Sequence, residues 1–139
     1  MKGQMRADLE SAIDRVVMMA RDATKLKMPV MPTFIVGTGT DMVAMTVPEY
    51  SDAKPITHAA IRKKLHEEGH EWYAFVFEAW VTKVPGAGRQ SAVIVGGVAR
   101  DAQDAPLLRT FIQDELALKE EEPMVEAVGP LLDLFRPMN

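Results

Sequence analysis

The spacing of apolar side chains along the chain predicts two amphipathic helices. Over residues 4–24 apolar positions recur every three or four residues, which places them on one face of an α-helix. Pro29 prevents this helix from continuing, because proline has no backbone N–H and clashes with the preceding turn. Residues 55–69 predict a second helix, since Pro55 suits a first helical turn and Gly69 suits the position just past a helix end.

Three further segments have the composition of β-strands. Residues 30–47 contain two arms rich in β-forming residues around 38–41 (TGTD), which predicts a hairpin with a tight turn. Residues 72–83 are apolar on both alternating faces, as in a strand at the centre of a sheet that is covered on both sides. Residues 91–100 predict the next strand, in which Gly96-Gly97 indicates a bulge or the close approach of another backbone.

The C-terminal part of the chain has a weaker pattern. Residues 106–114 fit a helix or a strand face, and the short turn after the preceding strand favours a strand. The acidic run at 120–122 is expected to be a solvated loop or the start of a helix, and 125–135 predicts a final short helix that Pro130 shapes or splits. The segment at 85–89 is expected to be a loop.

The predicted order of elements is α-β-β-α-β-β-β-α. This order implies a single α+β domain over residues 1–139, with a five-stranded, mainly antiparallel sheet and helices packed on it. One domain is also what a chain of 139 residues predicts.

Composition and charge narrow the classes of partner. Apolar residues make up 47% of the chain and charged residues 26%, as in a globular domain. A net charge of −4 is unfavourable for nucleic acid and for anionic membranes, which bind clustered basic residues. No segment approaches the ~20 apolar residues of a membrane span, and the absence of cysteine excludes thiolate metal sites. We expect a cytoplasmic protein with no nucleic-acid or membrane partner.

The stretch at 66–70 (HEEGH) matches the H-E-x-x-H pattern of zinc proteases. In that pattern two histidines one helical turn apart bind zinc, here His66 and His70, and the adjacent Glu67 is the general base. Gly69 opposes this interpretation, because a helix that ends there places His70 in the link to the next strand. The simpler interpretation is a charged helix end at which the dipole favours a cation such as His66. Zinc is therefore a minority expectation, and no other cofactor is expected.

Glu78 is a second candidate, because it lies in the middle of the most apolar predicted strand. A carboxylate in that position must be hydrogen-bonded, paired or exposed at a cleft. The functional interpretation is a metal ligand or a general base in a cleft. The simpler interpretation is an ion pair with Arg100, Arg109 or Lys83 on a neighbouring strand.

Methionine is frequent, with ten in the chain. Methionines are expected to fill the core adaptably, because the thioether side chain is flexible and polarisable. The six to which this applies are Met18, Met19, Met28, Met31, Met42 and Met45.

The segment FVFEAWV, which carries Glu78-Ala79-Trp80 toward the end of its strand, resembles uncharacterised small phage and prokaryotic proteins. The resemblance covers residues 60–115 and implies a related α+β fold, but no activity. The expected function is a small non-catalytic binding or interaction module, with a homodimer as the expected assembly because such a sheet leaves exposed edges. The alternative is a zinc-dependent hydrolase built on His66, Glu67 and His70, or around Glu78.

Overall fold

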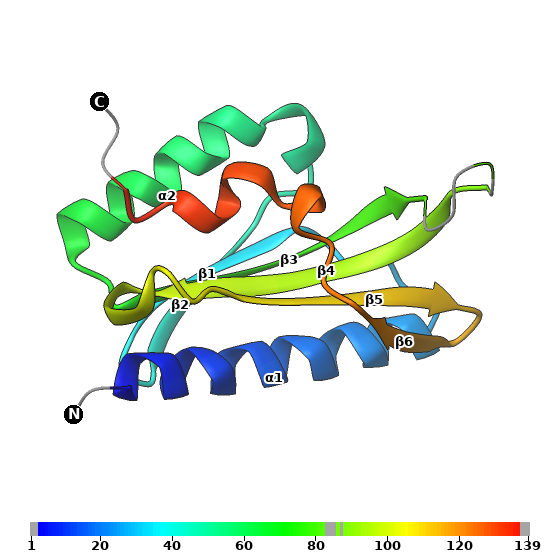
Figure 1. Ribbon diagram of the computed structural model, residues 1–139, viewed down its shortest axis with the longest axis horizontal. Coiled ribbons are helices and arrows are strands. Elements are labelled where there is room, and N and C mark those ends of the chain that lie inside the picture. The colour runs from blue at the N-terminus through cyan, green and yellow to red at the C-terminus, as the bar shows by residue number, and fades with distance from the viewer. Residues whose placement is uncertain (1–2, 83–85, 87, 137–139) are drawn as a thin grey trace.

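The computed structural model describes residues 3–82, 86 and 88–136, and these form two α-helices on an antiparallel sheet of six strands (Figure 1). The strands lie in the order β2-β1-β3-β4-β5-β6 across the sheet. The helices are α1 (Gln4–Lys25) and α2 (Lys54–Glu68), and the strands are β1 (Thr33–Thr38), β2 (Asp41–Thr46), β3 (Trp72–Val81), β4 (Gln90–Ala99), β5 (Leu107–Asp114) and β6 (Ala117–Glu121). The short 3-10 helices are η1 (Tyr50–Asp52), η2 (Arg100–Ala102), η3 (Val125–Ala127) and η4 (Gly129–Asp133).

The sheet separates two apolar layers. α1 packs on one face, mainly over β3 and β4, whereas α2 and the η3–η4 segment lie on the opposite face (Figure 1). The helical periodicity explains this arrangement, because Leu9 and Ile13 of α1 and Ile61 and Leu65 of α2 are all buried against the sheet. Full burial of one such side chain contributes about 1.5–3 kcal/mol.

β3 is the central strand that the sequence predicts. Tyr73 and Phe75 face the layer that contains α2, and Trp72 and Ala74 face the layer that contains α1. The single α+β domain with antiparallel strands, the first hairpin and the strand assignment at 106–114 are confirmed in the described residues. Parts of the predicted loop at 85–89, and Lys83 at the end of the predicted strand, lie outside those residues.

The described sheet has six strands, so the prediction of five is wrong. The added strand is β6, and it includes part of the acidic run at 120–122, which pairs with β5 instead of forming a solvated loop or a helix start. Arg109 Nη2 donates to Glu120 Oε1 at 2.7 Å, and this hydrogen bond holds the pKa of the Glu120 carboxyl below its ordinary value. A cross-strand arginine and the burial of Leu118 therefore support a strand among residues whose own composition disfavours one.

The C-terminal helical segment lies where it was expected but has a tighter form. Two 3-10 helices, η3 and η4, replace one α-helix, and Pro130 stands in the first turn of η4. Tyr73 anchors this segment to the sheet, because its hydroxyl donates to Leu131 O at 2.5 Å and accepts from Leu134 N at 3.3 Å. Burial raises the pKa of the Tyr73 hydroxyl, so the donor is retained.

The Gly96-Gly97 pair allows two backbones to approach each other closely. The pairing of β4 with β3 and β5 runs through both glycines without an extra residue, so there is no bulge. A Cβ on Gly97 would overlap Tyr73 O and lie 2.7 Å from Leu9 Cδ1 of α1. Of the two expectations for this pair, close approach is the one that is confirmed.

His58 gives α2 a pH-dependent contact with η1. Its Nε2 lies 2.7 Å from Tyr50 Oη, and burial, reinforced by the charges of Lys54 and Arg62, lowers the pKa of His58 from its ordinary value of 6.5. The unfolded chain then binds the proton more tightly than the folded protein. The free energy of unfolding is therefore highest above about pH 6.5 and falls as the pH drops toward the folded-state pKa.

Replacing His58 with glutamine should make this pH dependence weaker. When the free energy of unfolding is measured with urea, we expect it to fall less in His58→Gln than in the native protein between about pH 7.5 and 5.5. The matched control is His66→Gln, at an exposed position of α2, which should keep the pH dependence of the native protein. The same pH dependence in His58→Gln would contradict the conclusion that His58 causes it.

Candidate functional site

The HEEGH stretch lies at the end of α2, and the helix stops inside it. Gly69 has φ 68° and ψ 30°, the left-handed conformation that ends helices. His66 and Glu67 are exposed in the last turn, whereas His70 lies beyond the helix in the link to β3. The two histidines therefore do not share a helical face, which is what the zinc-protease pattern requires.

These residues do not fit a catalytic zinc site. Such a site needs three protein ligands and an open position. Across residues 3–82, 86 and 88–136, no three His, Asp or Glu side chains are grouped in a way that could hold a metal ion. We derive no zinc chemistry from His66, Glu67 and His70.

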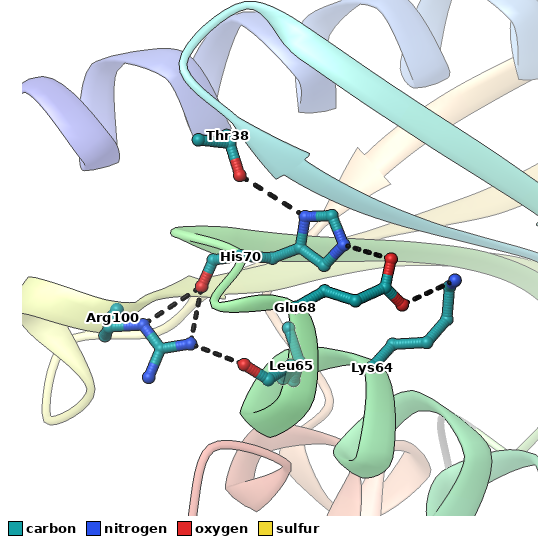
Figure 2. Close-up of polar contacts among 6 residues, drawn as sticks. All are labelled: Thr38, Lys64, Leu65, Glu68, His70 and Arg100. Carbon is teal, nitrogen blue, oxygen red and sulfur yellow. Dashed lines mark hydrogen bonds and ion pairs between the residues drawn. The ribbon is translucent and has the colours of Figure 1, made fainter.

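His70 is a structural residue that joins the end of α2 to the first hairpin (Figure 2). Its Nδ1 lies 3.3 Å from Thr38 Oγ1. Its Nε2 is buried, and Glu68 Oε1 is 3.6 Å away, longer than a hydrogen bond. Lys64 Nζ donates to the other oxygen of Glu68 at 2.9 Å and lowers the pKa of that carboxyl.

The cation at the C-terminus of α2 is Arg100, which enters from the end of β4 (Figure 2). Its Nη2 donates to Leu65 O at 2.8 Å and to His70 O at 2.6 Å, and its Nε donates to His70 O at 3.0 Å. The guanidinium also lies over the Phe135 ring, 4.7 Å from its centroid. His66 stands in the last turn of α2, as the simpler interpretation expected, and Arg100 adds the hydrogen bonds to the carbonyls. The local pattern does not mark Arg100, because it is 35 residues from Leu65 in the chain.

Glu71 and Trp72 close the same junction from the strand side. Gly39 N donates to Glu71 Oε1 at 2.7 Å, and Trp72 Nε1 donates to Gly39 O at 3.2 Å. Glu71 N also donates to Gly37 O at 2.8 Å. These bonds fix the β1–β2 turn against the start of β3, so the whole junction serves the fold.

Glu78 is exposed on β3 and binds a backbone amide. Its Oε1 accepts a hydrogen bond from Val30 N at 2.5 Å. The predicted ion pair with Arg100 or Arg109 is wrong, because Arg100 binds the carbonyls of the α2 junction and Arg109 binds Glu120. Lys83, the third predicted partner, lies outside the described residues. Glu78 therefore holds the link before β1 in place.

An apolar groove runs beside α1, over β1 and β2, and we call it the α1 groove. Its volume is about 520 Å³, which is in the range of roughly 300–1,000 Å³ found for ligand sites. One wall is the flank of α1 from Ala12 to Ala23, and the floor includes Ile35, Ala44 and Val76. The link at 29–31, which Glu78 holds through Val30 N, also lines the groove.

The groove exists because the two faces of the sheet are covered unequally. On one face α2 and the η3–η4 segment both contribute buried side chains, so that layer has two elements. On the other face α1 is the one described helix, and it packs mainly over β3 and β4. β2 therefore keeps exposed apolar side chains on that face, at Met42 and Ala44, beside the buried Ile35 of β1.

The rim of the α1 groove is rich in methionine, which the sequence analysis did not foresee. Five methionines expected in the core are exposed instead, and Met19 and Met42 are among those that line the groove. The exposed ones are Met18, Met19, Met28, Met31 and Met42. Met45 does pack against the core, as expected. One signal was available: β2 is apolar on both alternating faces although an edge strand usually has a polar face.

Arg15 is the one charged residue in the lining of the α1 groove. The other two arginines of α1 are bound to the protein, since Arg6 donates to Ala105 O at 2.7 Å and Arg21 donates to Leu118 O at 2.9 Å. Arg15 makes no hydrogen bond or ion pair within the described part of the chain. The groove thus offers an apolar floor and one free guanidinium.

Comparison of the chain with known proteins gave no match among family models, curated proteins or solved structures. The resemblance to small phage and prokaryotic proteins therefore remains a prediction. The described helices include none that is long and apolar enough to cross a membrane.

Proposed function

We propose that the protein is a small non-catalytic binding module and that the α1 groove is its binding surface. The observation that carries this proposal is the apolar groove between α1 and β2, in which Met19, Met42 and Ala44 are exposed. Exposed apolar side chains in a groove favour the binding of an apolar partner, because burial removes them from water. The flexible methionine side chains on the rim suit a surface that adapts to what it binds.

The test uses Nile red, a neutral apolar dye, and two variants of adjacent residues. Ala44 lines the groove, whereas Val43 is exposed on the opposite face of the same edge strand. We expect saturable dye fluorescence with the native protein, at least ten times weaker binding to Ala44→Glu, and unchanged binding to Val43→Glu. The two variants place the same charge on the same strand. Equal effects of both, or no saturable binding to the native protein, would refute the groove as the binding surface.

We also propose that the protein forms a homodimer through the free edge of β2. Five of the six β2 residues are exposed, and Asp41, at the strand end, is the one charged residue among them. The opposite edge is protected, because β6 carries Lys119 and Glu120 and Arg21 donates to Leu118 O. Charged side chains on an edge strand oppose pairing with another chain, and β2 lacks them along its length.

In the dimer that we propose, Ala44 is expected at the centre of the pairing. Val47 N bonds to Pro32 O of the neighbouring strand, so alternation turns the N–H and C=O groups of Met42, Ala44 and Thr46 outward. A two-fold axis normal to the sheet pairs a residue with itself, and Ala44 is the middle one of the three.

A cysteine at position 44 tests the dimer, since the chain has no cysteine of its own. We expect Ala44→Cys to form a disulfide-linked dimer under mild oxidation, because directly opposed Cα atoms lie about 5.5 Å apart. Leu116→Cys, in the exposed β5–β6 turn, is the control and should stay monomeric on non-reducing gels. A monomeric Ala44→Cys protein, together with a monomer mass for the native protein in sedimentation, would exclude this pairing.

A further inference from the structure

We infer that the occupant of the α1 groove is an amphipathic helix of another protein, which carries a carboxylate opposite Arg15. This inference rests on the groove being the binding surface and adds the class of partner. It follows from three features of the groove, namely its width, its length and its single charge.

The width of the uncovered surface matches one helix. In each copy the floor of the groove crosses β1 at Ile35 and β2 at Ala44. Because neighbouring strands lie about 4.8 Å apart, this floor is roughly 10 Å wide, the diameter of an α-helix with its side chains. α1 already lies beside this surface, and a second helix next to it would complete the layer as α2 and the η3–η4 segment do on the other face. An added helix therefore restores the two-sided coverage of an α+β sheet.

The length and openness of the groove favour a helix over a small amphiphile. The wall from Ala12 to Ala23 covers eleven residue steps, or roughly 16 Å and three helical turns. Small-ligand sites enclose most of their ligand, whereas Met19 and Met42 on the rim of this groove are 68% and 37% exposed. Methionine-lined grooves suit an apolar helical stripe, because the thioether side chains repack around different residues.

The flank of α1 permits close packing of a second helix. Ala23 is half-buried at the groove, and its small side chain lets a helix backbone approach there, whereas Ala12 and Ala20 are already buried in the core beneath it. The helix does not come from the described part of a second copy, since α1 and α2 already bury their apolar faces in their own sheet.

Arg15 determines the charge of the partner. It is exposed and makes no hydrogen bond or ion pair in the described residues, and the groove around it is otherwise apolar or neutral. Asp8, two turns earlier on α1, accepts a hydrogen bond from Gln4. A guanidinium at the margin of an apolar surface favours a partner with a carboxylate at its flank, because charge complementarity fixes the register of docking.

The experiment is a paired selection from one displayed library of fourteen-residue helices. Each helix has leucine or isoleucine at i, i+4, i+7 and i+11, and its flanking positions are randomised among charged and neutral residues. The native protein and its Arg15→Glu variant are used as separate baits. We expect the native protein to select aspartate or glutamate at one flanking position and Arg15→Glu to select lysine or arginine there. Circular dichroism checks that both baits are folded. We expect Arg15→Glu to fold, because Arg15 is exposed.

The best selected peptide is then measured by fluorescence anisotropy. We expect at least tenfold weaker binding to Arg15→Glu, recovery when the peptide carboxylate is changed to lysine, loss with Ala44→Glu and no change with Val43→Glu. Selection of the same charges by both baits, or peptides that bind Ala44→Glu unchanged, would overturn the inference. Dodecanoate is titrated in parallel. If dodecanoate binds stoichiometrically and through Arg15 while no helix is selected, the occupant is an amphiphile and the inference of a helix is wrong. In that case Nile red binding would still support the groove as the binding surface.

Discussion

Replacing Gly97 with alanine is expected to lower the free energy of unfolding by about 3 kcal/mol. The new Cβ would overlap the backbone of Tyr73 and lie 2.7 Å from Leu9 Cδ1 and 3.1 Å from Ala74 Cα. Two of these three contacts are with the β3 backbone. That backbone cannot move away without breaking its pairing with β4, which extends over both strands. Overpacking is costly where the surroundings cannot yield, and here they include α1, β3 and β4 at once.

The matched control is Gly88→Ala. A Cβ there meets no atom within 4 Å and the residue is exposed, so the same substitution should change the free energy of unfolding by less than about 0.5 kcal/mol. Both variants are measured by urea unfolding, with the fluorescence of buried Trp72 as the probe. Equal midpoints for Gly97→Ala and the native protein would show that β3 and β4 lie further apart than the structure has them.

Replacing Arg100 with methionine is expected to lower the free energy of unfolding by about 2 kcal/mol. Methionine keeps much of the length and the apolar stem but removes the three hydrogen bonds to Leu65 O and His70 O. Leu65 O belongs to the last turn of α2 and His70 O lies just beyond it, where a cation also interacts favourably with the helix dipole. The contact of the guanidinium with the Phe135 ring is lost as well.

Two comparisons separate this effect from a general loss of charge. Arg89→Met, at an exposed position, should change the stability little, because side chains in water contribute little through charge alone. Arg100→Lys should restore less than half of the loss, since one ammonium cannot reproduce the planar fork that spans both carbonyls. Urea unfolding measures the three proteins. Full stability in Arg100→Lys would mean that charge alone, rather than the fork, holds the end of α2.

The junction and the α1 groove share one element, the first hairpin. Glu71 and Trp72 fix the turn of that hairpin, and Ile35 and Ala44 from its strands form part of the groove floor. The hydrogen bonds of the junction that follows HEEGH therefore also fix the hairpin that forms part of the proposed binding groove. A groove with a rigid floor loses less conformational entropy on binding than one that must first be ordered.

Glu78 shows what the sequence can predict about a buried strand's carboxylate and what it cannot. The expectation that a carboxylate in an apolar strand must find a partner is confirmed, because Val30 N donates to it at 2.5 Å. The choice of that partner is not visible in the sequence, since 48 residues separate the two. The expected partners were Arg100, Arg109 or Lys83, of which Lys83 lies outside the described residues, whereas the donor seen among those residues is a backbone amide in the link between α1 and β1.

The two edge strands also show which features the sequence predicts and which depend on distant residues. β2 was predicted from its β-forming residues, but its place at the free edge depends on β1 pairing with β3 on its other side. β6 was missed because Lys119, Glu120 and Glu121 have low strand propensity, and the contacts that support its pairing come from distant residues, Arg109 of β5 and Arg21 of α1. Propensity describes one residue, whereas the stability of an edge strand depends on the residues opposite to it.

By itself the sequence determined the periodic elements: α1 and α2, the first hairpin, and a central strand with apolar side chains on both faces. These follow from spacings of two or of three to four residues, and every residue involved lies within one element. Only the tertiary structure decided that one face of the sheet receives two covering elements and the other receives one. That choice depends on where segments far apart in the chain meet. Because the α1 groove is the surface left uncovered by that choice, no local pattern could have placed it.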